Sequence, residues 1–212
     1  ESAASSGSAS VQNVNDAPTG SVLVSGTASE GEVLSADTSG LGDADGLGAF
    51  SYQWRSDSVA ISGATGSSYT LTQSEVGTAV SVVVSYTDGQ GTAESVTSSA
   101  TASVQNVNDA PVGFTVSLSG SAQEDATLSA SASVTSDLDG LPSPLVFGYQ
   151  WQRFEGGSWT DISGATGSSY TLGDGDVGLS VRSVASYTDG QGTAESAASS
   201  GSASVQNVND AP

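Results

Sequence analysis

The chain of 212 residues contains no cysteine, no histidine and no lysine. The missing cysteines exclude a disulfide framework, a thiolate zinc site and a cysteine nucleophile. The missing histidines exclude a Ser-His-Asp triad and remove the commonest ligand of transition metals. Metal chemistry is therefore left to oxygen ligands, which suit hard cations such as Ca²⁺ and Mg²⁺.

Positive charge is almost absent as well. Arg55, Arg153 and Arg182 stand against 23 acidic residues, so the formal net charge is −20. Nucleic acids and anionic membranes are poor partners for such a chain, because their phosphates need Lys and Arg for neutralisation. The acids repel one another in a compact fold unless cations lie among them. No apolar run approaches the roughly 20 residues of a membrane-spanning helix, and we expect no membrane contact.

What the sequence does contain is a repeat. The motif Val-Gln-Asn-Val-Asn-Asp-Ala-Pro occurs at 11–18, 104–111 and 205–212, and its three copies hold every asparagine of the chain. Between the motifs, residues 61–71 recur unchanged at 162–172. This pattern predicts tandem domains, with a first repeat at 15–107 and a second at 108–212.

The first eighteen residues are identical to residues 195–212. Residues 1–14 are therefore interpreted as the last strand of a preceding repeat. We expect that segment to be mobile, or to pair with a sheet edge of a neighbouring molecule, since a lone strand has unpaired backbone groups.

Short runs with alternating apolar residues indicate β-strands within each repeat. Examples are 50–54, 80–86, 147–151 and 181–187, and the turns between such runs contain Gly, Asp or Ser. The spacing favours an all-β fold of two antiparallel β-sandwiches joined end to end. A tryptophan in the third strand of each repeat is typical of immunoglobulin-like domains. Without a disulfide, we expect these residues, Trp54 and Trp151, to pack on aliphatic side chains.

The runs Tyr-Gln-Trp, Ile-Ser-Gly-Ala-Thr, Tyr-Thr-Leu and Ser-Tyr-Thr-Asp-Gly resemble the immunoglobulin-like and cadherin-like repeats of giant bacterial surface adhesins of the RTX type. The motif Asn-Val-Asn-Asp-Ala-Pro resembles the cadherin linker Asp-x-Asn-Asp-Asn-x-Pro. The resemblance implies a non-enzymatic, extracellular protein at the bacterial surface, exported by type I secretion and active in cell adhesion and biofilms. It further implies monomeric extender repeats that contact their neighbours in the chain, while other domains bind the adhesive target.

The resemblance also implies Ca²⁺ at the linkers between domains. The matching positions for the central joint are Glu30, Glu75, Asn106, Asn108, Asp109, Asp137, Asp139 and Asp189, and those for the first joint are Asn15, Asp16, Asp43, Asp45 and Asp88. We expect the central joint to be better formed, because both of its flanking domains are present. Asn106 replaces an aspartate of the family motif and one linker residue is missing, so we expect one or two ions per joint. Independently of the family, an Asn-x-Asn-Asp segment before proline supplies suitable oxygens on an extended chain.

Each of these ligand predictions has a structural alternative. Asp88 and Asp189 precede glycine, and such an aspartate often bonds its own backbone in a turn. Glu75 can be a surface residue of a turn, and the asparagine motif can be a plain linker. For Asp43 and Asp45 the metal interpretation is favoured, because Asp-x-Asp-Gly-Leu occurs in both repeats while its neighbours differ.

Trp159 has no counterpart in the first repeat. Its spacing from Phe154 across Glu-Gly-Gly-Ser predicts a hairpin with a facing aromatic pair. A second hypothesis is that Trp159 binds a ligand, which makes the second repeat a carbohydrate- or protein-binding module. A third is that the repeats are accessory domains of a secreted enzyme.

Overall fold

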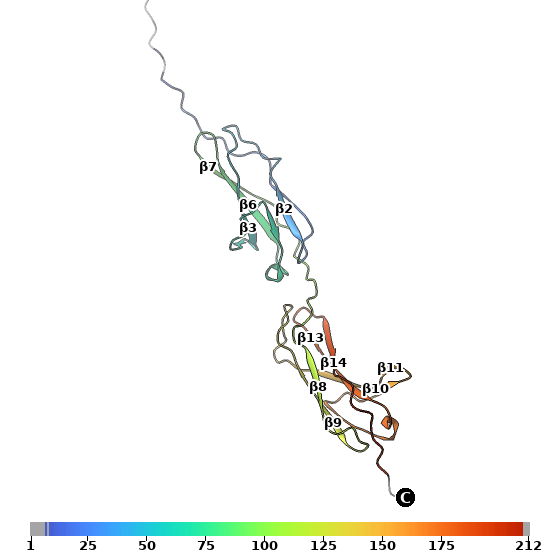
Figure 1. Cartoon of the computed structure of the whole chain (residues 1–212). Coiled ribbons are helices and arrows are strands. Elements are labelled where there is room, and N and C mark those ends of the chain that lie inside the picture. Colours follow the sequence, from blue (N-terminus) through green and yellow to red (C-terminus); the bar gives the residue numbers. More distant parts are fainter. Residues whose placement is uncertain (1–6, 8, 210–212) are drawn as a thin grey trace, which may run out of the picture. The chain divides into compact units, whose positions relative to one another are not determined.

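The computed structural model describes residues 7 and 9–209 (Figure 1). The chain divides into two compact units, Glu1–Val107 and Asn108–Pro212. The described residues contain no α-helix, and hence no helix long and apolar enough to cross a membrane. Within the N-terminal segment 1–14, residues 1–6 and 8 lie outside the described residues, and residues 9–14 are exposed and form no strand.

The first unit contains two antiparallel sheets. One sheet has the order β1-β2-β5, with bounds Leu23–Ser25, Val33–Asp37 and Ser68–Thr70. The other has the order β4-β3-β6-β7, with bounds Val59–Ala60, Ser51–Ser56, Val80–Thr87 and Ala93–Thr97. A short 3-10 turn, η1 (Gln73–Glu75), connects β5 to β6.

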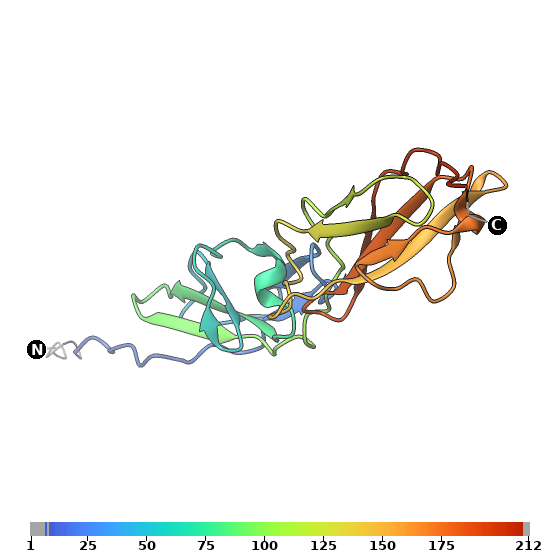
Figure 2. The ribbon, with the colours of Figure 1, turned by 90° about the horizontal axis from the view of Figure 1, so that it is seen from below.

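The second unit repeats this topology. One sheet has the order β12-β9-β8, with bounds Ser169–Thr171, Thr127–Ser133 and Thr115–Ser119. The other has the order β11-β10-β13-β14, with bounds Ser158–Asp161, Gly148–Glu155, Val181–Thr188 and Ala194–Ala198. The turn η2 (Asp174–Asp176) takes the place of η1. Figure 2 shows the two sheets of this unit as separate layers.

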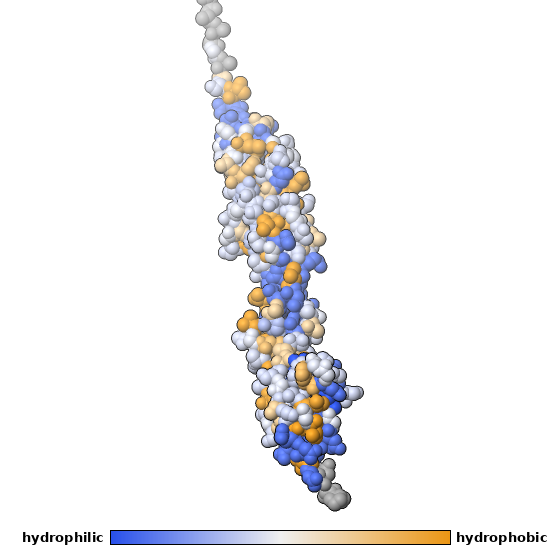
Figure 3. Space-filling view, turned by 45° about the vertical axis from the view of Figure 1, so that its right-hand side comes forward, coloured by the Kyte–Doolittle hydropathy of each residue, from blue (hydrophilic) through white to orange (hydrophobic). Residues whose placement is uncertain are grey.

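The core lies between the two sheets of each unit. Along β6, buried residues alternate with partly buried ones, because successive side chains point to opposite faces of a strand. Trp54 and Trp151 are fully buried among Leu and Val side chains, and each indole N–H donates to a glycine carbonyl, Gly66 at 2.9 Å and Gly167 at 2.8 Å. The predicted all-β fold with aliphatic packing around both tryptophans is confirmed. On the face that Figure 3 shows, apolar residues form small separate groups.

The fold brings two loops of each unit together. The loop between β2 and β3 carries the first Asp-x-Asp, and the loop between β6 and β7 begins at Asp88. The N–H of Gly89 donates to the carbonyl of Asp45 at 3.0 Å, which joins the two loops. In the second unit Gly190 donates to Gly140 at 2.8 Å across the equivalent loops. The predicted aspartates that these loops carry are thereby brought together in each unit.

Candidate metal centre

Asp189 stabilises the loop that follows β13. Its Oδ1 accepts hydrogen bonds from the N–H groups of Gln191 at 2.9 Å and Thr193 at 2.8 Å. Its Oδ2 is buried and, among the described residues, has no hydrogen-bond partner. Only 6 % of the residue is exposed, so this oxygen cannot be satisfied by bulk water. A buried, unpaired carboxylate oxygen destabilises a fold unless a cation or a donor reaches it.

Asp88 has the same arrangement in the first unit. Its Oδ1 accepts from Gln90 and Thr92, both at 2.8 Å, while its buried Oδ2 is unpaired within the described part of the chain. Burial acts to raise the pKa of Asp88, but hydrogen bonds from Thr92, Gln90 and Gly91 outweigh it and hold this pKa below its ordinary value. The carboxyl group is therefore ionised in neutral solution, with one oxygen in the turn and the other free.

The Asp-x-Asp pair lies beside this loop. In the second unit, Oδ1 of Asp137 accepts from the N–H of Asp139 at 3.0 Å, and its Oδ2 accepts from the hydroxyl of Tyr187. Burial, followed by the hydrogen bond to Asp137, raises the pKa of Tyr187 well above its usual range. In the first unit, Asp43 makes the same two contacts, and the pKa of Tyr86 is raised to about 12 for the same reasons. The tyrosine thus stays protonated and orients the first aspartate.

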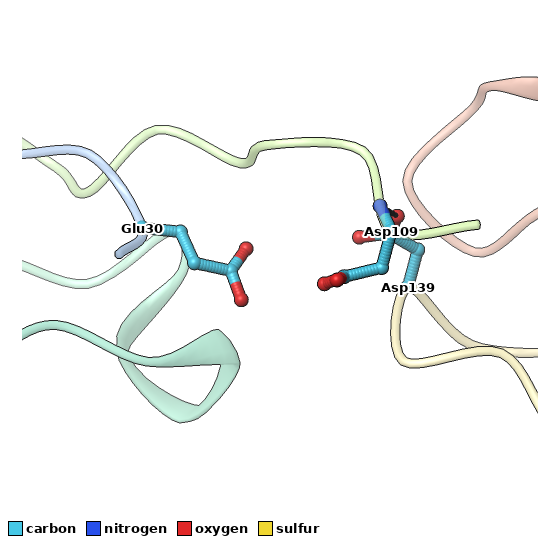
Figure 4. Close-up of side chains that lie close together, drawn as sticks. All are labelled: Glu30, Asp109 and Asp139. Atoms are coloured by element: carbon cyan, nitrogen blue, oxygen red, sulfur yellow. Dashed lines mark hydrogen bonds between the residues drawn. The ribbon is translucent and has the colours of Figure 1, made fainter. Parts of the chain in front are cut away.

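The linker motif is attached to this end of the unit that follows it. Asp139 Oδ2 accepts from the N–H of Asp109 at 2.7 Å, and Asn108 Nδ2 donates to Glu195 at 2.9 Å. Figure 4 shows the side chains of Asp109 and Asp139 close together. The first unit has the equivalent contacts, from Asp16 to Asp45 at 2.8 Å and from Asn15 to Glu94 at 2.7 Å. Glu94 and Glu195 were not among the residues predicted from the sequence.

Three of the predicted residues form a compact acidic cluster. Asp137, Asp139 and Asp189 each offer one carboxylate oxygen, and these oxygens lie within 4.8 Å of one another. Two like charges about 5 Å apart repel by roughly 3 kcal/mol at an effective dielectric near 20. The two arginines of this unit are engaged elsewhere, since Arg153 contacts Asp176 and Arg182 lies over Trp159. The cluster therefore offers hard oxygen ligands, and Ca²⁺ binds six to eight of these.

Glu30 lies where the chain leaves the first unit. Its carboxylate faces the N–H of Val107 at 3.4 Å, and Gln73, with its amide nitrogen turned toward these acceptors, donates to Glu30 at 2.8 Å and to Asn106 at 3.3 Å. Figure 4 includes the Glu30 side chain. In the second unit Glu124 accepts from the N–H of Val208 at 2.9 Å. Each repeat thus holds the outgoing linker with a glutamate.

Glu75 is placed differently from the other predicted ligands. It is 3 % exposed, and its Oε2 accepts from the N–H of Thr72 at 2.9 Å and from the Thr72 hydroxyl at 2.8 Å. These contacts cap η1. The alternative prediction, a surface residue of a turn, is confirmed in placing Glu75 in a turn, but it is wrong about exposure because the side chain is buried. The role of Glu75 as a metal ligand stays a prediction.

No family model matches this chain, and a search of curated proteins finds no match either. The adhesin resemblance thus rests on the sequence motifs.

Trp159 lies on β11 directly opposite Phe154 on β10, with ring centroids 5.2 Å apart. Gly156 and Gly157 both have positive φ in the connecting turn, which accounts for the Gly-Gly pair. The predicted hairpin with facing aromatics is confirmed. Trp159 lies on strand β11, whereas the acidic cluster is carried by the loops before β10 and after β13.

Proposed function

We propose that the chain is a pair of structural repeats from an extracellular bacterial surface adhesin, and that Ca²⁺ bound at the linkers stiffens the array. The observation that carries this proposal is the buried, unpaired Oδ2 of Asp189 within the cluster of Asp137, Asp139 and Asp189. The recurrence of the same unpaired oxygen at Asp88 supports it. A solvated acidic surface does not need to bury a carboxylate oxygen without a donor, whereas a metal site does.

Calcium fits this cluster on chemical grounds. All available donors are carboxylate, carboxamide and carbonyl oxygens, and neither thiolate nor imidazole exists in the chain. A divalent cation converts the repulsion among the three aspartates into attraction to a common centre. Magnesium is less suitable, because it demands a near-ideal octahedron and retains several waters.

The proposed stiffening acts through the linker backbone. The N–H of Val107 is held by Glu30 of the preceding repeat, and the N–H of Asp109 is held by Asp139 of the following one. Only Asn108 separates these two positions in the sequence. We propose that the ion orders this segment, with linker oxygens joining the aspartates as ligands. An extender of this kind performs no reaction, acts as a monomer, and leaves target binding to other domains.

Isothermal titration calorimetry of the whole chain with CaCl₂ tests the proposal. We expect calcium binding that is reduced in stoichiometry by Asp189→Asn, which keeps an oxygen acceptor for the loop and removes the charged Oδ2. At a ligand concentration of 100 times Kd, binding stabilises a fold by about 2.7 kcal/mol, so a rise in the Tm of the second repeat should accompany it. Without calcium, Asp189→Asn should be as stable as the parent or more so.

A matched control is Glu155→Gln, which removes one exposed charge of the same repeat outside the cluster. Calcium binding should be unchanged in this variant. If the parent chain binds no calcium at millimolar concentration, or if both variants bind it equally, the cluster is not the site.

A further inference from the structure

The hairpin of β10 and β11 is the place where the second repeat departs most from the first. Ten residues separate Trp151 from Ile162, against six between Trp54 and Ile61. The longer hairpin pairs four residues with four, whereas β3 and β4 pair two with two. Figure 1 shows β10 and β11 extending from the side of the second unit. The sandwich is complete in the first repeat without this extension.

The extended hairpin carries an aromatic pair and a polar row on one face. Gln152 lies opposite both Asp161 and Arg182, and its Nε2 donates to Asp161 at 2.7 Å while its Oε1 accepts from Arg182 Nε at 2.8 Å. Side chains two positions apart point to the same face of a strand. Phe154 and Trp159 therefore share the face of this row, opposite to the buried Trp151.

The aromatic pair is partly open to solvent and held in place. Phe154 is 41 % exposed, and Trp159 is half-buried with the Arg182 guanidinium 4.4 Å from its ring centroid. A Cβ at Gly201 would lie 2.9 Å from the indole, so glycine is needed where the tail passes the ring. The first repeat has Ala100 at that position and no tryptophan.

Some polar atoms of this row remain available to form hydrogen bonds with a ligand. Its internal hydrogen bonds use one carboxylate oxygen of Asp161 and only Nε of Arg182. In the part of the chain that the structure describes, the second Asp161 oxygen and the terminal nitrogens of Arg182 make no hydrogen bond. An aromatic surface bordered by a few oriented donors and acceptors is the arrangement that fixes a small polar ligand with an apolar side.

We propose that this face, formed by Gln152, Phe154, Trp159, Asp161 and Arg182, binds a neutral polysaccharide. The C–H face of a pyranose ring packs on the aromatic pair, and its hydroxyls bond to Asp161 and Arg182. An anionic chain is disfavoured, because Asp161 borders the site and the net charge is −20. A protein partner needs roughly 800 Å² of surface on each side, and the cluster offers two rings and one polar row.

The inference goes beyond calcium-dependent extension and does not depend on it. Affinity electrophoresis tests it, with the whole chain run in native gels that contain dextran, laminarin or hydroxyethyl cellulose, and in an alginate gel. We expect retardation by at least one neutral polysaccharide and none by alginate. Trp159→Ala and Phe154→Ala should each weaken the apparent affinity at least tenfold, whereas Val59→Ala on the short hairpin of the first repeat should leave it unchanged.

A second variant guards against misfolding of the alanine variants. Replacing 152–161 by the six residues Arg-Ser-Asp-Ser-Val-Ala of the first repeat gives a hairpin that this scaffold already accommodates, and retardation should be lost. Trp54 and Trp151 are fully buried, so a ligand-induced change in tryptophan emission should come from Trp159. The proposal is overturned if none of the neutral polysaccharides retards the chain, or if the exchanged hairpin is retarded equally. Trp159-dependent self-association in sedimentation, without retardation, would identify a second copy as the occupant instead.

Discussion

The backbone N–H of Asp109 donates a 2.7 Å hydrogen bond to Oδ2 of Asp139, thirty residues further along the chain. Asp16 and Asp45 have the same relationship in the first unit, at 2.8 Å. The aspartate of the linker motif is thus fixed by its backbone to the repeat that follows. This contact makes the motif part of the folded domain as well as a connection between domains.

Loss of the Asp139 carboxylate should release the linker. In Asp139→Ala we expect the amide of Asp109 to exchange with deuterium at least tenfold faster, because its acceptor is gone. Hydrogen exchange followed by mass spectrometry in chelator measures this without any contribution from calcium. Asp45→Ala is the matched control, and it should speed exchange around Asp16 alone. Equal protection of the second linker in Asp139→Ala and the parent would show that the contact contributes nothing.

The core of the second repeat contains a replaceable hydroxyl. Ser183 is fully buried opposite Trp151, and its Oγ has no hydrogen-bond partner among the described residues. Val82 occupies the same position opposite Trp54 in the first repeat. Ser183→Val should therefore raise the free energy of unfolding of the second repeat by about 1 kcal/mol, through loss of an unsatisfied polar group.

Urea unfolding of the whole chain, followed by tryptophan fluorescence, tests the substitution at Ser183. The reverse change Val82→Ser is the control, and it should destabilise the first repeat by at least as much. A drop in stability for Ser183→Val would mean that the core of the second repeat has no room for the added methyl group.

The phenol of Tyr170 should lose its proton at a higher pH than an ordinary tyrosine does. Burial, followed by its 2.7 Å hydrogen bond to Asp176, raises the pKa of Tyr170 to about 12 from an ordinary value near 10. Because the folded state holds this proton more tightly than the unfolded state, the stabilisation is fully present below pH 10 and is lost as pH rises through about 12. Absorbance of tyrosinate at 295 nm measures the titration. In Tyr170→Phe the late-titrating absorbance should fall, and an unchanged amplitude there would refute the assignment.

The fold was predictable because period-two alternation and the two internal copies are strong signals. Strand β6 buries one face, so the spacing of Val80, Val82 and Val84 is enough to predict them as core residues. The burial of Glu75 was also readable from Thr72-Gln-Ser-Glu75, since a threonine three residues before a glutamate is the signature of a capping box.

The sequence predicts which residue types form the candidate site, but it does not predict which atom of each side chain is available to a ligand. For Asp88 and Asp189 the turn and the metal interpretations were treated as alternatives, yet one oxygen makes the turn and the other is free. Sequence does not distinguish the two oxygens of a carboxylate. Glu94 and Glu195 escaped prediction because their contacts with Asn15 and Asn108 depend on where the neighbouring strands end.

The most direct test of calcium stiffening is small-angle X-ray scattering of the whole chain, first in millimolar CaCl₂ and then in chelator. We predict that calcium gives the scattering of a single extended form, and that chelator gives the profile of two domains in variable arrangement with a lower Tm. Asp189→Asn should scatter in calcium as the parent does in chelator. Identical profiles and melting temperatures in both buffers would contradict the account, leaving the asparagine motif as a linker and the aspartates as turn residues.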